Sequence, residues 1–148
     1  SHYSEKGLAQ LNLPVGRASP RAVQQNGVPA KIKDWHRTTE TALKQILAGR
    51  EPKKFPPLDM TGTAFQKSVW RALQKISLGK TKSYGEIASA ISRPKAVRAV
   101  GGACGANPIP VLVPCHRILA ANKKIGGFSG GLEWKRSLLK REGIKFNA

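Results

Sequence analysis

Three adjacent side chains in the segment IPVLVPCHRIL, residues 109–119, could together activate a nucleophile: Cys115, His116 and Arg117. The thiol of Cys115 is the nucleophile, and the imidazole of His116 can take its proton directly or through a water. Arg117 adds positive potential that favours the thiolate. A lone buried cysteine is often only a small inert hydrophobic residue, however. Two interpretations of Cys115 therefore stay open at this point, a nucleophile and a structural thiol.

A carboxylate would be needed to hold the histidine in its useful tautomer. Only two acidic residues follow Cys115, namely Glu133 and Glu142, and Glu142 falls in the last turn of the last predicted helix. The second cysteine, Cys104, has no CxxC partner and no repeated Cys/His spacing around it, which argues against a zinc site or a disulfide framework. We interpret Cys104 as core packing and expect free thiols in a reducing compartment.

The charge balance points to a polyanionic partner. The 148 residues include 26 Lys and Arg against 8 Asp and Glu, a net charge of +18, and nucleic acid is the commonest reason for such a field. Surface lysines that serve solubility, or a membrane surface, are the alternatives. Residues 61–148 carry sixteen basic and three acidic residues, so a polyanion should bind mainly there. With no membrane-spanning apolar segment and no signal peptide, we expect an intracellular protein.

The N-terminal part predicts a small unit of one strand and one helix. Residues 7–13, GLAQLNL, alternate apolar and polar side chains as a strand does, and residues 14–29, with three prolines and two glycines, predict a loop. A helix is predicted over residues 34–47, ended by Gly49. Three prolines in residues 52–59 indicate a connection to a second unit.

The second unit begins with a helix in which apolar residues recur at helical spacing over residues 63–76. Thr63 is its candidate N-cap, and Gly79 ends it. Trp70, and Trp134 later in the chain, stand among other apolar residues at this spacing, so we expect core packing for both rather than base stacking.

Two short helices then follow with a tight turn between them. Ser83 and Glu86 have capping-box spacing before residues 84–92, and Pro94 suits the first turn of the next helix, residues 95–104. This arrangement predicts a helix-turn-helix, although many helical hairpins pack in this way and bind nothing.

The second of these helices carries mostly small residues around Arg98. A major-groove reader usually presents several Asn, Gln, Arg or Ser side chains to base edges, whereas Ala and Gly let a helix approach DNA closely with little sequence reading. Arg98 could enter a groove or replace an extruded base; a solvent-exposed arginine is the alternative.

The last predicted helix covers residues 132–143 and is closed by Gly143. Its inward residues are Leu132, Leu138 and Leu139. Lys135 on the same helix could contact a phosphate or the nearby loop, and an ordinary solvated charge is equally compatible with the sequence.

The string PVLVPCHR, with NP just upstream, closely resembles the active-site loop of the O6-alkylguanine-DNA alkyltransferases, also called methylated-DNA–protein-cysteine methyltransferases. The resemblance is strong over residues 61–148, where SYGEIA, RPKAVRAVGGACGANPIP, PCHR, GGFSGG and KREG follow in the family's order. Residues 1–58 resemble only the end of the family's N-terminal domain.

The resemblance implies a catalytic role for four residues. Cys115 would accept the alkyl group from guanine O6 by in-line displacement, once per molecule, because the thioether is not hydrolysed. His116 would act as a base through a water, Glu142 would orient His116, and Tyr84 would donate a proton or hydrogen bond to guanine N3.

The resemblance also implies a DNA surface and a base pocket. Arg98 matches the arginine that fills the stack after the nucleotide flips out, as chemistry on a stacked base requires. The small residues around it would face the minor groove: Ala96, Ala99 and Gly101. Pocket and loop positions follow as Asn107 (a hinge), Pro110 (a pocket wall), Ile118, Phe128, where many members carry Tyr, and Ser129, whose N–H would contact O6.

Together these observations predict an α/β protein in two parts. Residues 1–58 would form a small α/β unit, a truncated RNase H-like domain with a linker, and residues 59–148 a mainly helical, winged-helix-like domain for DNA binding and alkyl transfer. We expect a monomer that repairs O6-alkylguanine in double-stranded DNA without metal or organic cofactor. It would lie in the cytoplasm or nucleoid of a prokaryote or in a eukaryotic nucleus. The alternative is a non-catalytic basic helix-turn-helix protein that binds DNA or senses lesions.

Overall fold

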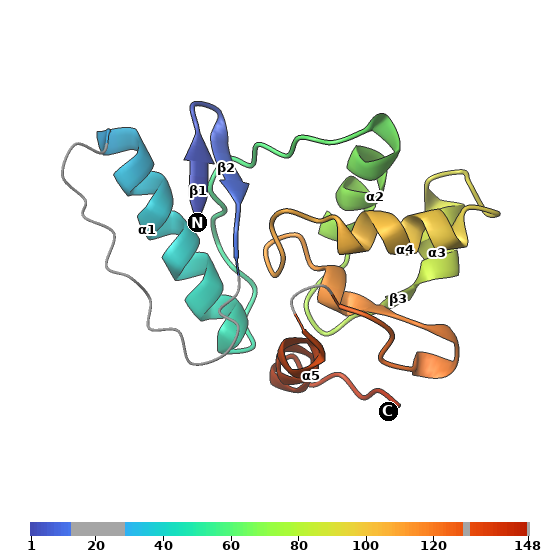
Figure 1. Cartoon of the computed structure of the whole chain (residues 1–148). Helices are drawn as coiled ribbons and strands as arrows, with labels where there is room; N and C mark the ends of the chain where they lie inside the picture. Colours follow the sequence, from blue (N-terminus) through green and yellow to red (C-terminus); the bar gives the residue numbers. More distant parts are fainter. Residues whose placement is uncertain (13–28, 129–130, 148) are drawn as a thin grey trace.

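The computed structural model describes residues 1–12, 29–128 and 131–147 and shows a mixed α/β chain (Figure 1). Within these ranges there are five α-helices and two small two-stranded sheets. Helix α1, Ala30–Leu47, lies beside the β1–β2 hairpin, and helices α2, α3 and α4 gather on the other side of the molecule. None of the described helices is long and apolar enough to cross a membrane.

The N-terminal hairpin pairs β1, His2–Ser4, antiparallel with β2, Gly7–Gln10. The strand predicted over residues 7–13 is confirmed for its first four residues, while β1 is too short to be predicted. The loop predicted over residues 14–29 lies almost wholly outside the described residues. The segment of residues 52–59, which connects the two parts of the chain, packs along β2. Leu8 N donates to Pro57 O (2.7 Å), and Asp59 N donates to Leu8 O (2.8 Å).

Helix α1 begins four residues before the predicted start, directly after Pro29, whose fixed φ of −55° suits a helix entrance. Its buried face is Thr39, Ala42 and Ile46, at helical spacing. This face packs on the hairpin and fixes the N-terminal part to the rest of the core.

The predicted N-cap Thr63 and the predicted capping box of Ser83 and Glu86 are both present, and Thr63 also forms a capping box with Gln66. At α2, Ala64–Gln74, the Thr63 hydroxyl accepts from Gln66 N (3.1 Å) and the Gln66 side chain accepts from Thr63 N (3.0 Å). Ser83 and Glu86 make the same exchange at α3, Tyr84–Ala90. These local bonds satisfy N–H groups that the first helical turn leaves unpaired. Helix α2 ends at Gln74, before the predicted Gly79, which occupies a later turn with φ +81°.

The predicted position of Pro94 in the first turn of the next helix is wrong. Ala96 N donates to Arg93 O (2.9 Å), so Pro94 occupies the second position of a turn, and α4 starts only at Val97 and runs to Gly105. Proline suits that turn position because its φ is already set. Trp70 of α2 is buried, as predicted, and its indole N–H donates to Ala103 O (2.9 Å), which ties α2 to α4.

The C-terminal part supplies the remaining elements. The 3-10 turn η1, Cys115–Arg117, runs into β4, Ile118–Leu119, which pairs in parallel with β3, Lys82–Ser83. The short turn η2, Ala121–Lys123, follows, and α5 spans Leu132–Arg141. Because Tyr84 directly follows β3, this pairing brings the start of α3 alongside the segment that holds Cys115.

Helix α5 is closed by Gly143 at φ +72°, as predicted, and it buries Leu138 and Leu139 completely. The expectation for Leu132 is wrong: this first residue of the helix is 40% exposed, because its position lies beyond the part of α5 that packs on the core. Trp134 is half-buried rather than fully in the core.

One main cluster of buried hydrophobic residues joins both parts of the chain. It includes Leu8, Ala42 and Ile46 from the N-terminal part together with Val69 and Leu73 of α2. The N-terminal part therefore packs on the same core that supports α4 and η1.

Candidate active site

Cys115 stands on a tightly held loop and is only 4% exposed. Asn107 fixes this loop, since its amide N–H donates to Val113 O (2.8 Å) and its Oδ1 accepts from Ile109 N (2.9 Å). Val111 between them adopts φ +75°, which is strained for a β-branched residue and indicates a backbone conformation imposed by its surroundings. Asn107, predicted as a hinge, thus connects the end of α4 to the loop before Cys115.

His116, Arg117 and Glu142 form a buried charged cluster behind this loop. Glu142 Oε1 lies 2.9 Å from His116 Nε2, and the Glu142 carboxylate accepts from Arg117 Nη2 (2.9 Å) and Nε (3.0 Å). Arg117 Nη1 also donates to Ile76 O (2.6 Å). Arg117 thereby has a structural role, anchoring the carboxylate that contacts the histidine.

The protonation of this cluster follows from its burial. Burial lowers the pKa of His116, against the opposing effect of Glu142. Burial alone would raise the pKa of Glu142, but the hydrogen bonds from His116 and Arg117 outweigh it and hold that pKa below its usual value. At neutral pH the pair is thus a neutral imidazole and a carboxylate.

This state fixes which imidazole nitrogen carries the proton. A carboxylate only accepts hydrogen bonds, so the neutral ring must donate through Nε2, which leaves a lone pair on Nδ1. In the part of the chain that the structure describes, Nδ1 is buried and has no hydrogen-bond partner. His116 therefore carries a free basic nitrogen on the ring atom that does not face Glu142.

A cavity of about 210 Å³ opens beside the Cys115 thiol. Helices α3 and α4, the turn η1 and the loop before α5 line it, and the described lining residues are Tyr84, Gly101, Cys104, Gly105, Cys115, Gly127 and Phe128. Tyr84 is half-buried, and burial raises its pKa, with the nearby thiols adding to the effect. Its hydroxyl is therefore protonated at neutral pH and available as a hydrogen-bond donor.

Lys135 lies fully buried under the same site. Its ammonium donates to Ile118 O (2.7 Å) and Gly127 O (3.2 Å). Of the three possibilities given by the sequence, the contact with the nearby loop is the one observed. A phosphate contact and a solvated charge are wrong, because the side chain is buried. Burial lowers the pKa of Lys135 to about 8, with the thiols of Cys115 and Cys104 opposing that shift. At neutral pH a cation thus stands within electrostatic reach of both thiols.

Cys115 is a protonated thiol at rest. Burial raises its pKa to about 11, while the Asn107 side chain and the Lys135 charge act in the opposite direction. A reaction at this sulfur therefore requires a base, and the Nδ1 lone pair of the adjacent His116 is the nearest candidate in sequence.

Helix α4 has one face in the core and one face that is exposed. Val100, Ala103 and Cys104 face the core, whereas Arg98 and Ala99 are exposed. The described residues give Arg98 no hydrogen bond or ion pair, so its guanidinium projects from a surface of small side chains. Ala96, the N-cap of α4, and Gly101 are half-buried on the same helix.

The remaining predicted pocket residues are placed as follows. Phe128 lines the cavity, as do two glycines that were not predicted for it, Gly105 and Gly127. Pro110 and Ile118 are buried but are not among the described lining residues. Ser129 lies outside the described residues.

The interpretation of Cys104 was incomplete, because the thiol is buried but also lines the cavity. For Lys135, helical spacing to Leu138, Leu139 and Glu142 was a usable signal of burial. For Cys104 the sequence offered no comparable signal.

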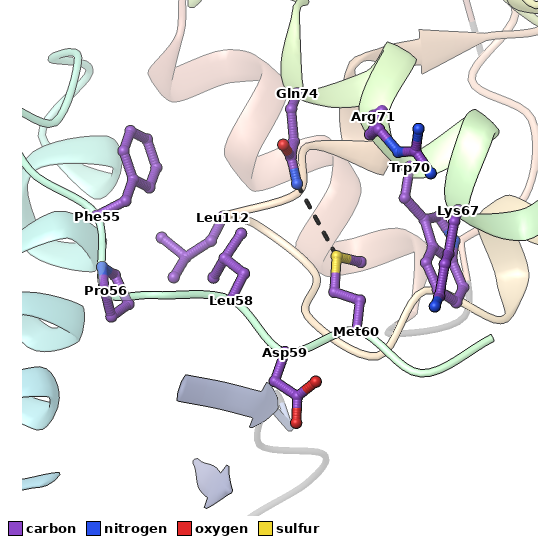
Figure 2. A pocket seen from close by; sticks show the side chains of 10 residues that line it. All are labelled: Phe55, Pro56, Leu58, Asp59, Met60, Lys67, Trp70, Arg71, Gln74 and Leu112. Carbon is purple, nitrogen blue, oxygen red and sulfur yellow. Dashed lines mark hydrogen bonds between the residues drawn. The ribbon is translucent and has the colours of Figure 1, made fainter. Parts of the chain in front are cut away.

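A second hollow lies between residues 55–60 and α2 (Figure 2). Its volume is about 670 Å³, and Figure 2 shows Phe55, Leu58 and Leu112 on one side with Lys67 and Arg71 of α2 on the other. It shares no lining residue with the cavity at Cys115 and holds no cysteine or histidine. The candidate nucleophile Cys115 therefore lies at the smaller cavity and not at this hollow. Within the described residues, no group of three or more His, Cys, Asp or Glu could hold a metal ion.

Comparison with known proteins gives a consistent result. The family model described as "6-O-methylguanine DNA methyltransferase, DNA binding domain" matches residues 64–144. A methylated-DNA–protein-cysteine methyltransferase of Methanosarcina acetivorans is 43% identical over 140 residues, which cover 94% of this chain and 87% of that protein. One of Haemophilus influenzae is 54% identical over 90 residues, 61% of this chain. This chain spans only 50% of that relative's length.

A solved structure of a related protein is also similar to this chain. The crystal structure of Mycobacterium tuberculosis OGT in complex with DNA superimposes with a TM-score of 0.67 at 47% identity. The match covers 72% of this chain and 65% of that one.

Proposed function

Because the chain belongs to the 6-O-methylguanine DNA methyltransferase family, we propose that it repairs O6-alkylguanine in DNA by moving the alkyl group onto Cys115, once per molecule. The observation that carries this proposal is the arrangement at one small cavity. A thiol opens into it, and the adjacent histidine holds a free basic nitrogen while its other nitrogen is bound to a buried carboxylate.

The proposed reaction begins with removal of the thiol proton. His116 Nδ1 takes it, directly or through a water, and Glu142 stabilises the imidazolium that forms. The positive charge of Lys135 favours the Cys115 thiolate at the same moment. The thiolate then attacks the alkyl carbon, a carbon–sulfur bond forms, and the bond between that carbon and O6 breaks.

The departing guanine carries away the electron pair of the broken bond and needs stabilisation. The protonated Tyr84 hydroxyl, on the cavity wall, is proposed to donate to guanine N3. A thioether is not hydrolysed under these conditions, so Cys115 is not regenerated and each molecule acts once.

The DNA contacts of this proposal fall on α4. O6 cannot be reached by a thiolate inside a stacked duplex, so the nucleotide must be extruded. Arg98 would fill the vacated stack, and Ala96, Ala99 and Gly101 would allow close approach to the minor groove. The excess of basic residues in 61–148 supports phosphate-dominated binding with little sequence preference.

The finer structural assignments belong to the same proposal. Residues 59–148 would act as a winged-helix-like domain for DNA binding and transfer, and residues 1–58 as an RNase H-like unit that packs against it. Phe128 would form an apolar wall for the base, Ser129 would offer its N–H to O6, and Asn107, Pro110 and Ile118 would support the loop. The protein would act as a monomer inside the cell.

Intact mass tests the proposal. The protein is incubated with duplex DNA that contains one O6-methylguanine, and the same protein carrying Cys115→Ser serves as the control. The proposal expects one added methyl group on Cys115 of the original chain and none on the variant. DNA binding with an unchanged mass would overturn alkyl transfer and leave the non-catalytic DNA-binding alternative.

A further inference from the structure

The two cysteines of the chain line the same cavity. Cys104 comes from the last turn of α4 and Cys115 from η1, and both are free thiols that open on the same space of about 210 Å³. The exposed fractions of these residues are only 7% and 4%. The proposed transfer uses Cys115 alone, so Cys104 is a second thiol in the pocket without a part in that reaction.

Both thiols are coupled electrostatically to each other and to one cation. The Cys115 charge raises the pKa of Cys104, after the larger effect of burial, and the Lys135 charge lowers the pKa of each thiol. The pKa is about 11 for Cys115 and about 12 for Cys104. His116 directly follows Cys115 in the chain, so Cys115 is the thiol that the proposal deprotonates.

The last turn of α4 is held on its core side, where Trp70 donates to Ala103 O, and is open on its other side. A Cβ placed on Gly102 or on Gly105 would have no heavy atom within 4 Å, so the last turn of α4 borders open space. A disulfide needs Cα atoms roughly 4.4–6.8 Å apart, so the proposal requires Cys104 and Cys115 to come within that range.

We propose that Cys104 is a resolving thiol for Cys115, so that hydrogen peroxide converts the pair reversibly to a Cys104–Cys115 disulfide. The Cys115 thiolate attacks one peroxide oxygen, the O–O bond breaks, and water leaves after the second oxygen takes a proton. Cys104 sulfur then attacks the Cys115 sulfenic acid, the S–O bond breaks, and a second water leaves. The two thiols lose two electrons in total, and the peroxide gains them.

The consequence for activity rests on the proposed function. The disulfide withdraws the acceptor sulfur and ties α4 to η1 across the cavity that would receive the base. It also diverts Cys115 from sulfinic acid, which thiol reductants do not reverse. A protein that can use its acceptor only once would thus keep that acceptor recoverable under peroxide stress.

The sequence makes the product simple to detect. No Lys or Arg lies between the two cysteines, so trypsin releases both within the single peptide AVGGACGANPIPVLVPCHR, residues 99–117. The full chain is treated with hydrogen peroxide at equimolar and tenfold ratios, and the peroxide is removed with catalase. Free thiols are then alkylated with iodoacetamide before digestion.

The proposal expects a peptide two hydrogens lighter, without alkylation, that gains two labels when dithiothreitol precedes iodoacetamide. In Cys104→Ser and Cys104→Ala, Cys115 should instead pass to sulfinic acid at the tenfold ratio, and dithiothreitol should not restore its labelling. Sulfinic acid on Cys115 beside an alkylated Cys104 in the original chain would overturn the proposal, as would a peptide dimer.

A separate assay tests the effect of the disulfide on activity. Methyl transfer from duplex DNA that contains O6-methylguanine is measured before peroxide, after peroxide and after dithiothreitol. Loss after peroxide and recovery after dithiothreitol is the expected pattern. If untreated protein accepts no methyl group, the proposed function fails while the disulfide result still stands. Activity that persists in fully disulfide-bonded protein would refute the inhibitory consequence.

Discussion

Replacing Glu142 by Gln should destabilise the protein strongly, although the two side chains have nearly the same shape. The carboxylate accepts from His116 Nε2 and from two nitrogens of Arg117, and its side chain is fully buried. An amide has only one acceptor oxygen, so one donor of the cluster would face an NH₂ group. Arg117 would also keep its charge without a counter-charge, even with the bond to Ile76 O and one bond to the amide oxygen retained.

The size of the effect follows from this loss. Breaking a buried ion pair by removing one partner costs about 3–5 kcal/mol. We expect a loss near the lower end, about 3 kcal/mol, because the remaining amide oxygen still accepts one bond. Since about 1 kcal/mol shifts Tm by roughly 2–4 °C in a chain of this size, Tm should fall by roughly 6–12 °C.

Urea denaturation followed by circular dichroism measures the free energy of unfolding directly. Glu86→Gln is the matched control, since this exposed capping-box position accepts either residue and should change stability by less than about 0.5 kcal/mol. In Glu142→Met with Arg117→Met, no charge is left unpaired, so the double variant should be more stable than Glu142→Gln. A loss below about 1 kcal/mol in Glu142→Gln, or a double variant that is less stable still, would refute the argument.

Three further predictions use other parts of the structure. Because burial holds the pKa of His116 below its usual value, the unfolded chain binds a proton below about pH 6.5 that the folded chain does not. The free energy of unfolding, from urea titrations, should thus decrease as the pH falls from 7.5 to 5.5. It should decrease again toward pH 4, because the pKa of Glu142 is also lowered. A free energy of unfolding that does not change with pH would contradict this. Gly7→Ala should lower the free energy of unfolding by about 2 kcal/mol or more, since φ is +147° and a Cβ would overlap the Pro57 carbonyl. Gly102→Ala, in open space within α4, should instead raise it by about 0.5–1 kcal/mol. Equal shifts of Tm in the two variants would refute the distinction. Arg98→Ala should slow repair of duplex DNA roughly tenfold or more but slow reaction with free O6-benzylguanine much less, because the free base needs no extrusion; equal losses in mass-based assays would argue against its role.

Local features of the fold were predictable because they depend on residues three or four positions apart. Thr63 and Ser83 cap their helices through bonds to the third residue along, and Gly143 ends α5 through its positive φ. The start of α4 was not predictable in the same way. Pro94 fits both a first helical turn and a β-turn, and only the bond from Ala96 N to Arg93 O selects the second.

The sequence by itself determined which groups could do chemistry. Cys115 and His116 are neighbours in the chain, and the choice of Glu142 as their carboxylate required only that few acidic residues follow them, together with the family resemblance. The excess of basic residues can likewise be known without a structure, because it is a sum over residues.

Tertiary structure alone decided what surrounds those groups. The Arg117 contact with Glu142, the Lys135 ammonium beneath the loop and the Cys104 thiol on the cavity wall all join residues from different elements. Their pKa shifts arise from burial, which depends on how α4, η1 and α5 pack, and no spacing in the sequence encodes it. The sequence therefore specified the candidate nucleophile, and the packing specified its protonation state and the second thiol beside it.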